Sequence, residues 1–168
     1  MRFHEDSEMT VHGTSNLHDW TMDVETIDGE IAIRPGSDGA VPAIERVSVQ
    51  VPVESIVSDK NRQNRKTYEA LKSNRYPTIF FDANEGEVAT EDGRLAVVAR
   101  GAVTIAGTRR PVDVQATGTR LDGGAYRFQG EHALRLSDFD VERPSAMLGT
   151  IRVGDEIRLT FDVTVVPE

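Results

Sequence analysis

Apolar and polar residues alternate along most of this chain, and this period of two restricts its fold more than any other feature of the sequence. The clearest runs are residues 47–53, 95–105 and 157–165, in which every second residue is apolar or small. Because successive side chains of a strand point to opposite faces, such runs are typical of antiparallel strands with one buried and one solvated face. The sequence therefore predicts an all-β fold.

Turn residues separate the alternating runs at regular intervals. Asp92-Gly93 and Asp122-Gly123 are dipeptides that favour tight hairpins. The pattern predicts eight or nine strands, at about residues 8–14, 18–27, 29–34, 44–54, 78–85, 94–105, 110–120, 125–136 and 156–166. This spacing favours a sandwich or a closed barrel. The length of 168 residues fits a single domain over residues 1–168.

One segment lacks the alternation. Residues 59–74 contain helix formers, Asp59 is a candidate N-cap, and Tyr76-Pro77 would end a helix, so we expect one short helix near residues 60–73. Residues 60–76 carry six cations against Glu69 alone, in a chain whose net charge is −9. It is either a cationic lid that holds an anionic head group such as a pyrophosphate, or a solvated helix face that balances acidic neighbours.

The apolar positions of the three clearest runs are mostly valine, alanine and glycine, and Phe161 is the bulky exception. An eight-stranded barrel has an interior that is just wide enough to be filled by side chains or to hold one small ligand. Small inward residues therefore indicate an apolar cavity. The alternative is a sandwich whose two sheets close over the same residues without a void.

Composition excludes several classes of function. With 28 acidic and 19 basic residues, the chain repels phosphate backbones, so we expect no nucleic acid partner. It has no cysteine, which excludes disulfides and thiolate metal sites. No stretch approaches the ~20 apolar residues of a membrane span, so we do not expect an integral membrane protein. The first ten residues lack the apolar core of a secretion signal, and we expect a cytoplasmic protein unless a leader has been removed.

The four histidines form no close ligand pair. His12 and His18 are six residues apart, His4 lies in the polar start, and His132 falls on the apolar parity of its strand. No nucleophile, base and orienting group stand in a recognisable pattern. We therefore expect no catalytic residues, no metal site and no cofactor.

Five segments, in order along the chain, carry motifs of a known family. They are HGTSNLHDW (residues 12–20), LKSNRYPTIFFDA (71–83), GAVTIAGTRRPV (101–112), LSDFDVERPS (136–145) and GTIRVGDEIRLTFDV (149–163). Together they resemble the YceI-like family of polyisoprenoid-binding, lipocalin-like proteins. Two positions depart from the family pattern: Val103 stands where leucine is usual, and Asp140 stands in place of a glycine.

The resemblance implies an eight-stranded antiparallel barrel of lipocalin type that holds an amphiphilic isoprenoid in its lumen, such as a polyprenyl phosphate or a prenylated quinone. It also implies a non-enzymatic protein that carries or sequesters this lipid. Members are often exported, so a periplasmic or secreted location stays open beside a cytoplasmic one. The sequence also leaves a homodimer open.

On such a barrel we expect Trp20 to line or plug the lumen with its indole N–H bonded, and His18 and Asp19 to fix that corner by hydrogen bonds. The lumen residues that we predict are Trp20, Met22, Val49, Val51, Tyr68, Leu71, Phe81, Val97, Ala99, Val103, Phe128, His132 and Phe161. The predicted head-group contacts are Lys60, Arg62, Arg65 and Lys66.

Two other functions remain compatible with the sequence. One is a barrel enzyme that acts on a hydrophobic substrate, with His132 or His18 as the group that transfers a proton. The other is a stress-linked structural or assembly protein that binds no ligand.

Overall fold

The computed structural model of the chain describes residues 1–37, 40–146 and 149–168. Its strands are β1 (Arg2–Phe3), β2 (Glu8–Gly13), β3 (Trp20–Val24), β4 (Asp28–Arg34), β5 (Ala43–Pro52), β6 (Ile56–Val57), β7 (Thr78–Glu91), β8 (Arg94–Ile105), β9 (Thr108–Arg120), β10 (Tyr126–Arg135), β11 (Ser145–Ala146), β12 (Ile151–Arg152) and β13 (Glu156–Val166). The α-helix is α1 (Asn61–Ala70), and the 3-10 turns include η2 (Val53–Ser55), η3 (Asp122–Gly124) and η4 (Leu136–Phe139).

The strands form a closed antiparallel barrel of eight strands, as predicted. Three barrel strands are each built from two segments: β1 with β2, β3 with β4, and β5 with β6. These are followed by β7, β8, β9, β10 and β13, and each barrel strand pairs with the next one along the chain. The ring closes where β13 pairs with β1 and β2. Closure removes the unpaired sheet edges, and it rules out the sandwich that the sequence left open.

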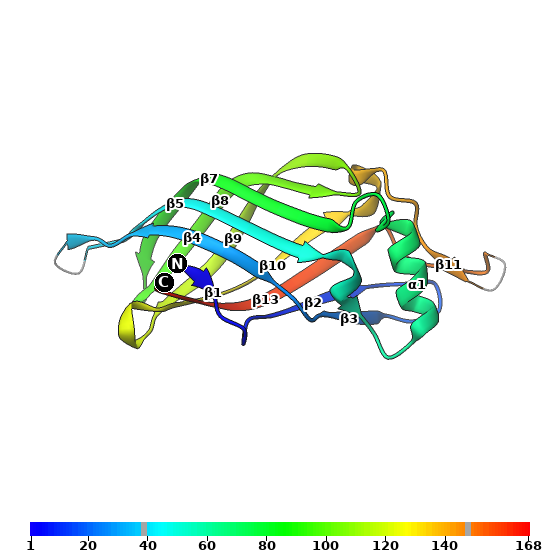
Figure 1. Ribbon diagram of the computed structural model, residues 1–168, viewed down its shortest axis with the longest axis horizontal. Coiled ribbons are helices and arrows are strands. Elements are labelled where there is room, and N and C mark those ends of the chain that lie inside the picture. Colours follow the sequence, from blue (N-terminus) through cyan, green and yellow to red (C-terminus); the bar gives the residue numbers. More distant parts are fainter. Residues whose placement is uncertain (38–39, 147–148) are drawn as a thin grey trace.

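Figure 1 shows the barrel as an elongated body with α1 at one end and both chain termini towards the other. Buried side chains gather along its axis in two clusters. Met22, Val53 and Phe139 belong to the cluster near α1, and Leu95 and Phe128 belong to the cluster near the termini.

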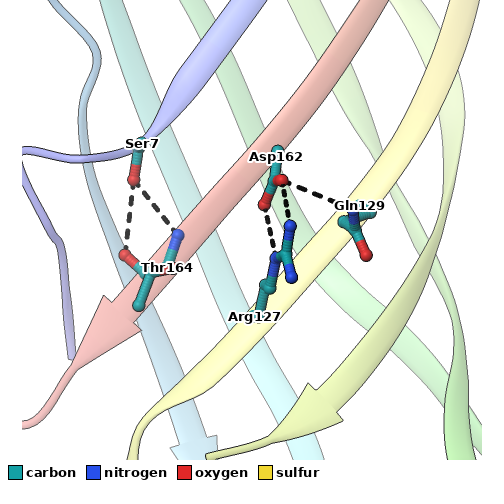
Figure 2. Close-up of polar contacts among 5 residues, drawn as sticks. All are labelled: Ser7, Arg127, Gln129, Asp162 and Thr164. Carbon is teal, nitrogen blue, oxygen red and sulfur yellow. Dashed lines mark hydrogen bonds and ion pairs between the residues drawn. The ribbon is translucent and has the colours of Figure 1, made fainter.

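Serine side chains maintain the pairing where two of the barrel strands are interrupted. Between β1 and β2, the Ser7 hydroxyl accepts a hydrogen bond from the Thr164 amide at 3.1 Å and lies 3.4 Å from the Thr164 carbonyl (Figure 2). At η2, the Ser55 hydroxyl donates to the Pro52 carbonyl at 2.7 Å, and the Ser55 carbonyl accepts from the Glu25 amide. These bonds satisfy backbone groups that the interruptions would leave unpaired.

Ion pairs on the outer face link neighbouring strands. Arg127 on β10 donates to both carboxylate oxygens of Asp162 on β13, and Gln129 donates to Asp162 at 3.3 Å (Figure 2). The hydrogen bond from Arg127 holds the pKa of Asp162 below its ordinary value. Phe128, between these two β10 residues, is buried on the opposite face. The alternation predicted from the sequence thus separates a charged outside from an apolar inside.

The helix spans residues 61–70 and is shorter than the predicted 60–73. The prediction of Asp59 as its N-cap is wrong, because Lys60 precedes the helix and makes no side-chain cap. The start is instead held by Asn64, whose side-chain oxygen accepts from the Ser58 amide at 2.7 Å and the Ser58 hydroxyl at 2.8 Å. The helix ends before Tyr76-Pro77, since Lys72 adopts a left-handed backbone with φ 55°.

One of the two Asp-Gly dipeptides forms the tight hairpin predicted for both, whereas Asp122-Gly123 lies in η3 within a longer connection from β9 to β10, which is closed by the Leu121 amide donating to the Ala125 carbonyl at 2.8 Å. Asp92 and Gly93 have φ of 52° and 77° and connect β7 to β8, which is the two-residue hairpin that Asp-Gly favours. Strand β7 runs to Glu91, well beyond the predicted end at residue 85, because it continues to pair with β8 after an irregularity between Ala83 and Glu85. A bulge of this kind lets a long strand bend around the barrel without losing its partner.

Candidate ligand cavity

The barrel encloses one long apolar cavity of about 500 Å³. This volume lies within the range of small-molecule binding pockets, roughly 300 to 1,000 Å³. Towards the termini the lining includes Ile31, Ile44 and Phe128, all of which are buried. At the α1 end its lining includes the exposed residues His18, Lys60 and Arg62, so the cavity opens to solvent there. We call this α1 end of the cavity the mouth.

The structure places almost every predicted lumen residue on the cavity wall. Those that line it are Trp20, Met22, Val49, Val51, Leu71, Phe81, Val97, Ala99, Val103, Phe128, His132 and Phe161. Tyr68 is not among the lining residues. Its hydroxyl donates to the backbone carbonyls of Ile56 at 2.8 Å and Glu54 at 3.1 Å, which anchors α1 to the end of the third barrel strand. Burial, followed by the charge of Glu54, raises the pKa of this phenol.

Several lining residues were missed. Strand parity would have found Val11, Leu134 and Leu159, which share the inward face with predicted neighbours on the same or adjacent strands. Phe139 and Val141 lie beyond the end of β10, where the sequence shows no alternation of apolar and polar residues. Both are nevertheless buried and line the cavity. They reach it because η4 folds back over the barrel end, held by Arg110, whose Nε donates to the Asp138 carbonyl.

Aromatic side chains on the wall lie over glycines of the neighbouring strand. Trp20 is opposite Gly13, Phe161 is opposite Gly130, and Phe128 is opposite Gly118. A Cβ added to Gly13 would stand 2.1 Å from the Trp20 ring, and one added to Gly130 would stand 2.8 Å from Phe161. Each ring therefore occupies space that a side chain on the opposite glycine would need. This arrangement keeps bulky rings against the wall and leaves the axis of the barrel open.

Trp20 lies close to the mouth, and its polar edge is satisfied there. The indole N–H donates to the Thr14 carbonyl at 3.0 Å. His18 lies next to it, with Nδ1 at 2.8 Å from the Asp19 carbonyl. The hydroxyl of Ser15 accepts from the amides of Leu17 and His18 and donates to the His18 carbonyl. These bonds hold residues 15–19 in a tight turn on the rim.

Cations surround part of the mouth. Lys60, Arg62 and Lys66 line the cavity, whereas Arg65 does not, because it is exposed on another side of the short helix. The ammonium of Lys66 donates to the Ser145 carbonyl across the mouth. None of these four cations has a carboxylate within 4 Å among the described residues. The rim therefore presents cations that form no ion pair within the described ranges.

His132 is the one titratable side chain on the wall away from the mouth, within the described ranges. It is half-buried, and no hydrogen-bond partner is found for it in the part of the chain that the structure describes. Burial lowers the pKa of its imidazole. Residues 1–37, 40–146 and 149–168 contain no group of three or more histidine, aspartate or glutamate side chains that could hold a metal ion.

A family model, the YceI-like domain, matches residues 4–165, which is nearly the whole chain. The chain belongs to the YceI-like family. This membership confirms the resemblance read from the motifs. In this YceI-like chain, Asp140 has φ 54° and ψ 31°, so it keeps the left-handed conformation that a glycine would adopt at that position.

Solved structures share the fold of this YceI-like protein at low sequence identity. A polyisoprenoid binding domain from Saccharophagus degradans, implicated in plant cell wall breakdown, is 13% identical with a TM-score of 0.72, over 99% of this chain and 98% of that one. Burkholderia cenocepacia BcnA is 15% identical with a TM-score of 0.71, over 95% of this chain and 96% of that one. The Campylobacter jejuni YceI protein is 16% identical with a TM-score of 0.66, over 88% and 84% of the two chains.

No protein of curated function matches the chain. None of the helices in the described residues is long and apolar enough to cross a membrane.

Proposed function

We propose that this protein binds an amphiphilic isoprenoid lipid in the barrel lumen and carries or sequesters it without chemical change. The observation that carries the proposal is the cavity itself: a long apolar interior whose lining is exposed beside a cluster of cations at the α1 end. The name of the Saccharophagus degradans relative, a polyisoprenoid binding domain, supports the same ligand class.

The wall suits a prenyl tail. Transfer of such a tail out of water is favourable by about 0.8 kcal/mol per CH₂ group, and this gain needs no directional contacts. Flexible, branched hydrocarbon fits a wall of valine, isoleucine, leucine and phenylalanine side chains. Polar groups at one end fix which way the lipid enters. The ligand classes that fit are a polyprenyl phosphate, whose head group would meet Lys60, Arg62 and Lys66, and a prenylated quinone.

The direct test is an organic extract of the purified protein, examined by mass spectrometry. We expect an isoprenoid in stoichiometric amount. Ala116 lines the cavity, whereas Thr117 is the next residue on β9 and faces outward. Ala116→Phe should reduce the bound lipid severalfold, and Thr117→Phe should not. Protein that folds, takes up no isoprenoid from mixed vesicles and has an empty extract would refute the proposal.

The same experiment distinguishes a carrier from an enzyme. A carrier returns its lipid unchanged after incubation. Recovery of an altered lipid, with the alteration lost and binding kept in His132→Ala, would assign an enzymatic role to the imidazole in the cavity wall.

A further inference from the structure

Two features of the mouth are unrelated to holding a ligand inside the barrel. The first is positive charge that points away from the cavity. Arg65, Lys72 and Arg75 are exposed, and none of them lines the lumen. Arg75 lies over the Tyr76 ring at 5.5 Å, and none of these three cations has a carboxylate within 4 Å in the described residues.

The charge around α1 is concentrated in one stretch of the chain. Residues 60–76 carry six cations, and Glu69 is the one carboxylate among them. This stretch has a local charge of +5 on a molecule of net charge −9. A positive surface on an acidic protein marks the side that approaches an anionic partner.

The second feature is Leu17, which is 64% exposed, more than any other large apolar side chain in the described ranges. It stands in the turn of residues 15–19, between Ser15 and His18, which both line the mouth. Hydrogen bonds from Asn16 to the Thr150 carbonyl and from the Arg152 amide to Asn16 tie this turn to residues 150–152. Leu17 is thus held towards solvent by ordered backbone. Figure 1 shows the connection between β2 and β3 at the same end of the barrel as α1.

We propose that the mouth docks onto an anionic lipid bilayer, with Arg65, Lys72 and Arg75 against the phosphates and Leu17 inserted between the head groups. Basic side chains beside an exposed apolar anchor are the combination by which peripheral proteins bind such surfaces. Docking in this orientation brings the opening of the cavity to the membrane, where a long-chain lipid can enter without crossing water. The docking itself requires no lipid in the lumen, so it goes beyond the proposed function and can hold or fail separately.

The test is flotation of the full-length protein, freed of lipid, with vesicles that contain no isoprenoid. We expect binding to vesicles of phosphatidylglycerol and phosphatidylcholine, little binding to phosphatidylcholine alone, and release when salt rises from about 0.05 M to about 0.5 M. The triple variant Arg65→Gln/Lys72→Gln/Arg75→Gln should bind anionic vesicles at least roughly tenfold more weakly. Leu17→Asn should weaken binding severalfold at the low salt concentration, where the wild type is bound.

The matched control removes the same charge from the other end of the barrel: Arg2→Gln/Arg94→Gln/Arg120→Gln should bind as the wild type does. All variants should retain lumen binding of an apolar fluorescent probe, which shows that they are folded and separates docking from the proposed function. Equal binding to both kinds of vesicle, or an unchanged triple variant, would overturn the proposal. Self-association that the triple variant abolishes, without vesicle binding, would assign the surface to a second copy of the chain instead.

Discussion

Three aromatic residues on the cavity wall each lie opposite a glycine of the neighbouring strand, and this pairing leaves the interior of the barrel open. The three pairs, Gly13 with Trp20, Gly118 with Phe128 and Gly130 with Phe161, recur at different depths of the cavity. Each glycine gives its ring a place on the wall, because any Cβ there would stand closer to the ring than van der Waals contact allows. The cavity thus depends on positions without a side chain as much as on the apolar side chains themselves.

Gly13→Ala should push the Trp20 ring away from the wall. We expect a loss of about 1 to 3 kcal/mol in the free energy of unfolding, which is the usual cost of overpacking. Trp20 is the only tryptophan in the chain, so its emission should also shift. Urea titration followed by fluorescence and circular dichroism measures both effects. In a Trp20→Ala background the same glycine substitution should cost much less, and equal costs in both backgrounds would contradict the pairing.

His132 should make stability depend on pH. Its pKa is lowered by burial, so the unfolded chain, with an ordinary pKa of about 6.5, takes up the proton first as the pH falls. The free energy of unfolding should therefore decrease as the pH falls from about 6.5 to the folded-state pKa, and this contribution should be level below it. Thermal melts across this range measure the slope. The His132→Gln variant should lack the pH dependence that His132 contributes. The control variant His12→Gln, which alters a side chain bonded to Thr160, should retain it.

At the scale of elements, α1 forms one side of the mouth, and its position depends on contacts at its start. Asn64 accepts from the Ser58 amide and hydroxyl and donates to the Ser58 carbonyl. Thr67 adds a contact with the sulfur of Met22 at 3.5 Å, and Tyr68 ties the helix to η2 and β6. The helix has no buried residue of its own, so these few contacts determine which of its side chains face the cavity.

Asn64→Ala should therefore loosen the helix. We expect a loss of about 1 to 2 kcal/mol, since a partly buried set of hydrogen bonds disappears. Asn61→Ala in the same helix removes an exposed amide that makes no such bonds among the described residues, and it should change stability by less than about 0.5 kcal/mol. Chemical denaturation compares the two. A similar loss in both variants would mean that general helix propensity, rather than the Ser58 contact, is measured.

The cations of α1 should distinguish lipid head groups. The variant Lys60→Gln/Arg62→Gln/Arg65→Gln/Lys66→Gln should weaken binding of phosphorylated prenols more than that of free prenols, by tenfold or more, because charge-assisted contacts to phosphate are lost. Arg65→Gln alone should have little effect on this preference, as Arg65 does not line the cavity. Competition binding with a matched pair of prenols measures the ratio, and an equal loss for both lipids would remove α1 from head-group recognition.

The whole molecule is a closed ring of hydrogen bonds around an interior that its own side chains do not fill. An empty apolar cavity forfeits the dispersion contacts that a lipid would supply. Strand pairing around the ring holds the barrel together without these contacts, and occupancy should add to its stability.

Removal of the lipid should lower the melting temperature of the purified protein, and reloading should restore it. A ligand held at 100 times its Kd contributes about 2.7 kcal/mol, which is several degrees for a domain of this size. Calorimetry on extracted and reloaded protein measures the shift. The Ala116→Phe variant, with a narrowed lumen, should respond much less, and an identical response would place the lipid outside the barrel.

The long strands, the single short helix and the inward parity were predictable from the sequence, because side-chain alternation and turn dipeptides act over a few residues. The short strands β1, β11 and β12 were not among the predicted ones. That local logic places Val97, Ala99 and Phe161 on the wall without knowledge of the fold. It could not reveal that Tyr68 and Arg65 turn away from the cavity, or that Phe139 and Val141 reach it. These positions and the glycine–aromatic pairs follow from the three-dimensional fold, since they depend on contacts between different strands, which a local pattern does not encode.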